Sequence, residues 1–311
     1  MNSARTAESI ESLMSMGFDE NQARHAFESC NGNLEQAVDY LLDGGDAAAA
    51  AGGGGNVTSG SETTTTTAPK MIVADNISQY SVEKGKSACT CIALTMAASF
   101  LQQVIEEDNK NKDAATRILT CDFLRHNIME GVDIYRQLVS CNTQMVEVEH
   151  MSAEEILEQQ EDMGNDALPK FASLELVGGY VRQGVLSTPG MDLQSMMQGC
   201  ITEYYQQNQH QQSQQWMAIL ITKTPETIVV CVPPPASEER HYCLLDSHPR
   251  PHLFVESSTN AYGRIYTTLD GLVQSLHTIF PSTVLGPDIP ETMAMMYNSF
   301  DLYPLVLKKK T

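Results

Sequence analysis

Two cysteines, Cys89 and Cys91, are separated by a single residue at the start of an apolar, alanine-rich stretch, GKSACTCIALTMAASF at residues 85–100. A cysteine at the N-terminus of a helix is favoured as a thiolate, because unpaired backbone N–H groups and the helix dipole stabilise negative charge there. A thiolate that attacks a carbonyl also needs a base to take its proton. The stretch alone is compatible with a nucleophile or with two packed thiols.

A candidate base occurs far downstream, in HYCLLDSHPRPH at residues 241–252, where Asp246 and His248 are two positions apart. Side chains alternate along a strand, so residues i and i+2 point the same way. Asp246 can then orient the His248 imidazole and stabilise its cation, as the third member of a catalytic triad does. His241 is a rival base, but it falls on the opposite strand face from Asp246. In the alternative interpretation, Asp246 only pairs with Arg250.

Helix geometry separates the two cysteines. A residue two positions along a helix is rotated by roughly 200° and faces a different surface. Because the nucleophile needs the helix end, Cys89 is the predicted nucleophile, and Cys91 is the rival that we expect to pack in the core. Five other histidines are predicted to be structural or solvated, without an obvious partner in the sequence: His25, His126, His150, His210 and His277.

The elements that must position these residues are predicted from the hydrophobic period. Helical periods precede period-two strands along the chain, and the last strand runs into a helix. Segregated helices and antiparallel strands predict an α+β domain, with helices first and the sheet last. The predicted helices cover residues 91–107, 114–139, 153–162 and 187–207, and the predicted strands fall within 216–235, 240–250 and 264–280.

A low-complexity stretch divides the chain. Residues 47–69, AAAAAGGGGNVTSGSETTTTTAP, have no apolar period and cannot bury enough surface to become ordered. We therefore expect a flexible tether between an N-terminal domain at residues 1–46 and a C-terminal domain at residues 70–311.

The N-terminal domain is predicted to contain three short helices, because apolar residues recur at helical spacing from Ile10 to Leu42. Turn chemistry separates the helices, with Gly17 in the first turn and Asn-Gly-Asn at 31–33 in the second. The string LMSMGFDENQARHAFESCNGNLEQAVDYLL at 13–42 resembles a ubiquitin-associated (UBA) domain. The resemblance implies a three-helix bundle that binds ubiquitin. The implied ubiquitin-binding residues are Met16, Gly17, Phe18, Asp39, Leu41 and Leu42.

In the C-terminal domain, the motifs KSACTCIALTMA and CLLDSHPR together resemble the herpesvirus large tegument protein deubiquitinase and its relatives outside viruses, the viral tegument-like deubiquitinases. These proteins are papain-like cysteine hydrolases. The resemblance implies that Cys89 is the nucleophile, His248 the base and Asp246 the acid that orients it.

The same resemblance implies that Gln79, ten residues before Cys89, donates a hydrogen bond to the oxyanion. Asn76 is an alternative donor. Two features depart from the family's pattern. Ala88 stands before the nucleophile in place of a polar residue, and Cys91 is a second cysteine in the motif.

Bulk composition limits the expected partners. Lys and Arg total 19 against 39 Asp and Glu, a net charge of -20, which argues against nucleic acid because phosphate binding needs basic patches. We find no leader pattern and no apolar run of about 18 residues, so we expect no membrane partner and a cytoplasmic or nuclear location. Eight cysteines are scattered without a CxxC pair, so neither a metal nor a cofactor is expected.

A ubiquitin-binding domain tethered to a Cys-His-Asp hydrolase predicts a deubiquitinase, a thiol isopeptidase that cleaves after the C-terminal glycine of ubiquitin through a thioester. The expected partners are ubiquitin, ubiquitin chains and ubiquitinated proteins. Two alternatives stay open. One is a non-catalytic ubiquitin receptor or adaptor with a degenerate hydrolase domain, and the other is a protease for another ubiquitin-like modifier.

Overall fold

The structure is a computed structural model of the 311-residue chain, and it divides into two compact units, Met1–Lys70 and Met71–Thr311. We call them unit 1 and unit 2. The residues that the structure describes are 9–10, 13–14, 20–29, 37, 70–108, 114–141, 150–163, 168–207, 215–235, 237, 241–251, 253–254, 257, 259–286 and 289–308.

Unit 1 contains helical segments around a small apolar core. Helix α2 spans Glu20–Ser29, and residues 9–10, 13–14 and 37 are also helical. Met14 is 43% exposed, so it lies outside this core. The buried side chains recur at helical spacing: Ile10, Leu13, Ala23, Ala26, Phe27 and Ala37. Outside the described residues lie the tether at 47–69 and the implied ubiquitin-binding residues Met16, Gly17, Phe18, Asp39, Leu41 and Leu42.

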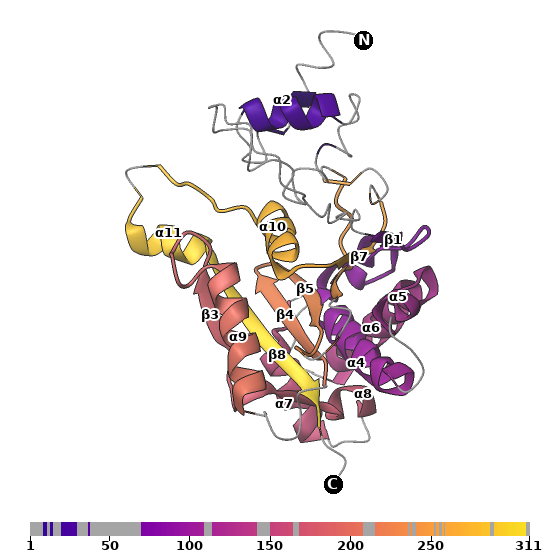
Figure 1. Cartoon of the computed structure of the whole chain (residues 1–311). Helices are drawn as coiled ribbons and strands as arrows, with labels where there is room; N and C mark the ends of the chain where they lie inside the picture. Colours follow the sequence, from indigo (N-terminus) through magenta and orange to yellow (C-terminus); the bar gives the residue numbers. More distant parts are fainter. Residues whose placement is uncertain are drawn as a thin grey trace. The chain divides into compact units, whose positions relative to one another are not determined.

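Unit 2 is built on one eight-stranded sheet (Figure 1). The strands are β1 (Lys70–Val73), β2 (Leu174–Leu176), β3 (Arg182–Val185), β4 (Met217–Lys223), β5 (Glu226–Val232), β6 (Tyr242–Asp246), β7 (Tyr262–Tyr266) and β8 (Ser299–Leu307). Their order is β1-β7-β6-β5-β4-β8-β2, and β3 also pairs with β8. The pairings β4–β5, β5–β6 and β6–β7 are antiparallel, as are those of β8 with β2, β3 and β4.

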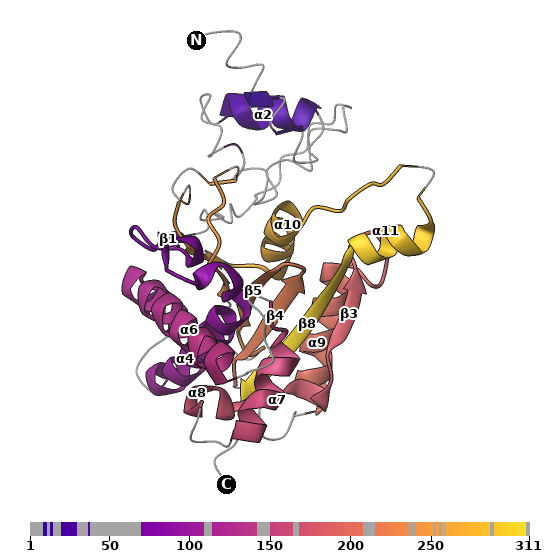
Figure 2. The ribbon, with the colours of Figure 1, turned by 180° about the vertical axis from the view of Figure 1, so that it is seen from behind.

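Helices cover both faces of this sheet. They are α4 (Cys89–Asp108), α5 (Ala114–Ile118), α6 (Cys121–Cys141), α7 (Ala153–Met163), α8 (Pro169–Ala172), α9 (Leu193–Gln207), α10 (Leu269–Ile279) and α11 (Glu291–Tyr297), with short 3-10 helices η1 (Gln79–Ser81), η2 (Gly85–Ser87) and η3 (Val177–Gly179). Figures 1 and 2 show α4 to α8 on one side of the sheet, and α9 and α10 on the other.

The two faces follow from alternation along the central strands. In β4, Ala218 and Leu220 join the core under α4, while Ile219 and Ile221 join the core under α9 and α10. A strand that is buried on both faces needs apolar residues at every position, which explains the continuous run MAILI.

Helix α4 is the central helix of unit 2. It packs against α6 and β5, and its residues from Cys91 to Val104 are almost wholly buried. Gly131 of α6 permits this close approach, because a Cβ at that position would lie 2.5 Å from the Ile92 Cα. The N-terminal end of α4, which carries Cys89, is thereby fixed against the sheet.

The expectation that no apolar run is long enough to span a membrane is wrong for α4. Residues Cys89–Glu106 form an 18-residue helical stretch that is long and apolar enough to cross a membrane. However, 78% of that stretch is buried inside unit 2, which is the pattern of a core helix in a globular domain.

The α+β class, with a helical stretch early and most of the sheet later, agrees with the sequence prediction. Three short strands, β1, β2 and β3, lie before or among the helices, and α10 and α11 come late, so the segregation is incomplete. Their short length hid these strands from a period-two search.

Two predicted helices have different bounds. The predicted helix at 114–139 is two helices, because Thr120 Oγ1 accepts a hydrogen bond from Phe123 N and caps a new start for α6. The helix predicted from 187 starts at Leu193, where Asp192 accepts a hydrogen bond from Ser195 N.

Candidate active site

Cys89 is the first residue of α4, and its side chain is only 1% exposed. Its sulfur lies 3.6 Å from the carbonyl oxygen of Pro225 and 3.9 Å from Nδ1 of His150. Burial raises the pKa of the thiol, but hydrogen bonds from His150 and His248 and the charge of His248 outweigh burial and lower the pKa to about 6. The helix terminus thus holds a thiol that ionises readily.

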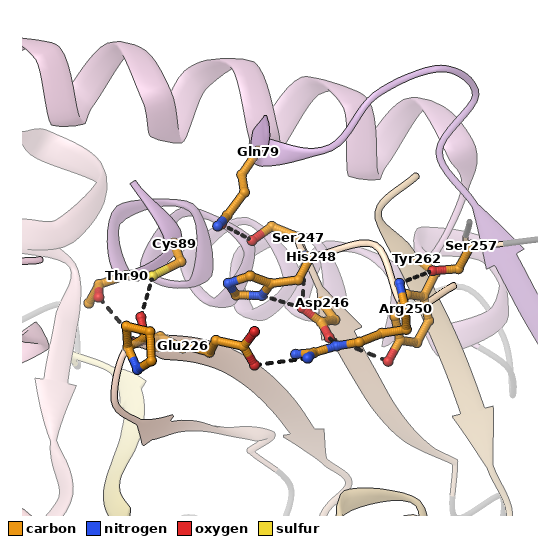
Figure 3. A network of polar contacts seen from close by, with 12 residues as sticks. Gln79, Cys89, Thr90, Glu226, Asp246, Ser247, His248, Arg250, Ser257 and Tyr262 are labelled. Carbon is orange, nitrogen blue, oxygen red and sulfur yellow. Dashed lines mark hydrogen bonds and ion pairs between the residues drawn. The ribbon is translucent and has the colours of Figure 1, made fainter. Parts of the chain in front are cut away.

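Asp246 and His248 form a close pair at the end of β6 (Figure 3). Oδ1 of Asp246 accepts a 2.6 Å hydrogen bond from Nδ1 of His248 and a 2.9 Å bond from its backbone N–H. The pairing therefore depends on a turn just past the strand, in which an Asp side chain bonds the backbone two residues on, rather than on strand alternation. Both side chains are buried, with exposed fractions of 0% and 2%.

This contact sets the charge state of the imidazole. Burial lowers the pKa of His248, but the charge and hydrogen bond of Asp246 outweigh it and raise the pKa to about 9. Nδ1 faces Asp246, so Nε2 is the nitrogen left for the sulfur (Figure 3). The lowered pKa of the Cys89 thiol, about 6, beside the raised pKa of the His248 imidazole, about 9, favours a thiolate–imidazolium pair at neutral pH.

Arg250 completes the buried charge network. Its Nε donates a 2.8 Å hydrogen bond to Oδ2 of Asp246, and its Nη1 lies 2.8 Å from Oε2 of Glu226. Burial raises the pKa of Asp246, but the charges of Arg250 and His248 and the His248 hydrogen bonds lower it to about 2. Tyr262 also donates to Oδ2, at 3.4 Å. Asp246 thus pairs with Arg250 and with His248 at the same time, through different oxygens.

The turn between β4 and β5 joins the two halves of the site. The Pro225 carbonyl oxygen lies 3.6 Å from the Cys89 sulfur. The next residue, Glu226, pairs with Arg250 (Figure 3). Thr90 Oγ1 of α4 lies 3.2 Å from Thr227 Oγ1, which fixes the turn to the start of the helix. The position of Cys89 relative to the Asp246–His248 pair is therefore set by a closed ring of contacts.

Gln79 lies close to this pair through Ser247. The Ser247 hydroxyl donates a 2.8 Å hydrogen bond to Oε1 of Gln79, and the Gln79 backbone N–H donates to the Ser247 carbonyl at 3.1 Å. Nε2 makes a long 3.5 Å contact with the Lys86 carbonyl. Figure 3 shows the Gln79 amide directed toward Cys89 and His248. Gly85 allows the approach, because a Cβ there would lie 2.1 Å from the Gln79 carbonyl oxygen.

The rival residues lie elsewhere. Cys91 is in the hydrophobic core, where burial raises its pKa. His241 precedes β6, at the opposite end of that strand from Asp246 and roughly 15 Å along it. Asn76 is exposed in a turn with φ 54°, so Gln79 is the candidate donor that the structure places beside the pair.

Sequence reasoning missed three residues of the site. His150, predicted to be structural or solvated, contacts Cys89. Ser247 donates a hydrogen bond to Gln79. Its position between Asp246 and His248 in the sequence was the signal that it lies near the site. Tyr80 is 48% exposed, and its ring stands edge-on to His248 with 6.0 Å between ring centroids. Among the described residues, no cluster of three or more His, Cys, Asp and Glu side chains is arranged to hold a metal ion.

The comparisons with known proteins concern the other unit. Residues 5–41 match the family model of the UBA/TS-N domain. Unit 1 therefore carries a UBA domain, as the sequence string at 13–42 predicted, and UBA domains bind ubiquitin or ubiquitinated proteins. A comparison of the chain with curated proteins found no match.

Proposed function

We propose that unit 2 is a cysteine hydrolase that cleaves isopeptide bonds after the C-terminal glycine of ubiquitin, so that the protein is a deubiquitinase. The observation that carries the proposal is a helix-terminal thiol, Cys89, with a lowered pKa beside the buried Asp246–His248 pair. The UBA domain in the same chain supports ubiquitin conjugates as the substrate class.

The reaction begins with the thiolate–imidazolium pair. The Cys89 sulfur attacks the carbonyl carbon of the ubiquitin C-terminal glycine, and the carbonyl oxygen becomes an oxyanion. Gln79 Nε2 and the Cys89 backbone N–H, one of the first N–H groups of α4, are the proposed donors to it. The C–N bond then breaks, and His248 gives its proton to the leaving lysine amine.

The second half of the reaction regenerates the thiol. His248, now neutral, takes a proton from water, and the water oxygen attacks the thioester carbonyl. The C–S bond breaks, the thiolate–imidazolium pair is restored, and the released carboxyl group of ubiquitin gives the remaining water proton to solvent. Throughout the cycle, Asp246 keeps Nδ1 protonated and the ring oriented.

The proposed fold family for unit 2 is papain-like. A cysteine at the start of a central helix, packed against an antiparallel sheet that carries the histidine, supports this assignment. The low-complexity stretch at 47–69 would tether the UBA domain and raise the local concentration of ubiquitinated substrate. The proposed location is the cytoplasm or nucleus, where ubiquitinated proteins occur.

The test is hydrolysis of a fluorogenic amide of the ubiquitin C-terminus by the 311-residue protein. We expect turnover by wild type and none above background by Cys89→Ala, while both bind ubiquitin through the UBA domain. Binding without turnover by wild type would instead support the non-catalytic receptor. Turnover only of amides made from other ubiquitin-like modifiers would support a different protease.

A further inference from the structure

His150 lies against the Cys89 sulfur, although 61 residues separate the two in the sequence. The Nδ1–Sγ distance is 3.9 Å, which is within hydrogen-bond range for sulfur. The surroundings of this imidazole differ from those of His248, since the His150 side chain is exposed and His248 is 2% exposed. The nucleophile therefore has two imidazole neighbours, and the proposed triad uses only one of them.

The backbone around His150 is fixed by its C-terminal neighbours. Met151 is buried in the core with 3% exposure. Ser152 and Glu155 form a capping box at the start of α7: Ser152 N donates to Glu155 Oε2 at 2.7 Å, and Glu155 N donates to Ser152 Oγ at 3.1 Å. The backbone just after His150 is thus held, and the His150 imidazole lies against the sulfur.

The electrostatic relation between the two residues is mutual. The hydrogen bond with Cys89 raises the pKa of His150, and His150 is the first of the contacts that lower the pKa of Cys89. Among the described residues, the other titratable groups that interact with the Cys89 sulfur are Tyr80, Cys91 and Tyr135. Their pKa values are all raised, so they stay neutral from acidic to mildly alkaline pH.

We propose that His150 is a second catalytic histidine, which shares the Cys89 thiolate with His248 through its exposed imidazole. Ionisation moves the Sγ proton to Nε2 of His248, and a proton from solvent on Nδ1 of His150 then places a second imidazolium beside the thiolate. His150 thereby keeps the nucleophile charged under mildly acidic conditions. The inference rests on the proposed function, because a thiolate held by two histidines is useful only to a nucleophile.

The test is the pH dependence of Cys89 alkylation by iodoacetamide in the 311-residue protein. Mass spectrometry with fragment ions that separate Cys89 from Cys91 measures the alkylation rate at the Cys89 sulfur. The alkylation of exposed Cys141 is the internal reference for reagent reactivity at each pH. The alkylation rate falls toward low pH as the thiol is protonated, and we call this part of the curve the acid limb. In His150→Gln we expect the acid limb to move up by roughly half to one pH unit, so the rate at pH 6 falls about three- to tenfold. His126→Gln, which changes an exposed histidine on α6, is the matched control and should leave the limb in place.

Two results overturn the inference. One is an unchanged acid limb in His150→Gln, including the case in which the rate falls equally at every pH, which indicates a structural role. The other is the same shift in His126→Gln. Alkylation needs no ubiquitin, so the outcome is separable from the proposed function: a shifted limb in a protein that cleaves no ubiquitin amide supports His150 as a thiolate partner and contradicts the deubiquitinase.

Discussion

Cys89 and Cys91 have the same residue type, the same helix and the same exposed fraction of 1%, yet their surroundings give them opposite properties. Cys89 faces Pro225 and the two histidines, and its pKa is lowered to about 6. Cys91 faces the apolar core, where burial raises its pKa. Burial alone would favour the neutral thiol at both positions. The difference shows that hydrogen-bonding and charged partners, from the turn after β6 and from the segment before α7, decide which thiol can ionise.

The largest expected effect comes from exchanging each cysteine for alanine. Cys89→Ala should lower kcat for the ubiquitin amide by more than about 10³-fold, because the nucleophile is lost. Cys91→Ala should keep kcat within about twofold and lower the unfolding free energy by about 1 kcal/mol, because only core packing changes. Steady-state kinetics and urea unfolding measure the two effects. Equal loss of kcat in both variants would contradict the distinction between the thiols.

Asp246→Asn should lower kcat by about 10³-fold, because the amide no longer holds Nδ1 of His248 protonated. It should also lower the unfolding free energy by about 3 kcal/mol, because Arg250 loses a buried charge partner. The acid limb of Cys89 alkylation should move to higher pH, which a loss of stability alone would not cause. His241→Gln is the control, and an equal loss of kcat in it would argue against Asp246–His248 as the pair.

Gln79→Ala should lower kcat by about 10²-fold while leaving the alkylation rate of Cys89 unchanged, because an oxyanion donor acts only in the transition state. The matched control is Asn76→Gly, which removes the alternative amide and keeps the backbone unstrained at φ 54°. We expect wild-type kcat in that control. A loss of kcat in Asn76→Gly with wild-type kcat in Gln79→Ala would assign the oxyanion contact to Asn76.

The pH profile of kcat/KM should show two limbs that belong to the coupled Cys89–His248 pair. Below about pH 6 the thiol is protonated, and the rate should fall about tenfold per pH unit. Above about pH 9 His248 loses the proton that the leaving amine needs, and the rate should fall again. A single limb near pH 8 to 9, as for an ordinary thiol, would mean that the partners do not lower the pKa of Cys89.

The sequence was informative where chemistry depends on local spacing. The Asp-x-His motif, the helix start at Cys89 and the UBA string could all be predicted, although the Asp246–His248 contact is made by a turn rather than by strand alternation. Capping residues explain the boundaries that were missed. Thr120 and Asp192 interrupt runs with a continuous helical period, because a side-chain oxygen that accepts from the next turn starts a new helix there.

Contacts between distant segments could not be predicted. Arg250 meets Glu226 only because β5 and β6 are neighbours in the sheet, and His150 meets Cys89 only because α7 and α4 pack in one core. A capping box in Ser-Ala-Glu-Glu at 152–155 marks the start of α7, but nothing in it indicates which residue the preceding histidine will contact. Contacts of this kind depend on tertiary packing, so they can be identified only once the fold is known.

The role of Cys89 as the nucleophile is tested most directly by the site at which a ubiquitin probe with a C-terminal electrophile becomes covalently attached. We predict one adduct, on the sulfur of Cys89, which forms in wild type and in Cys91→Ala but not in Cys89→Ala. Fragment-ion mass spectrometry of the peptide that contains both cysteines identifies the modified sulfur. No adduct on wild type, or an adduct on Cys91 that persists in Cys89→Ala, would contradict the assignment of Cys89 as the nucleophile.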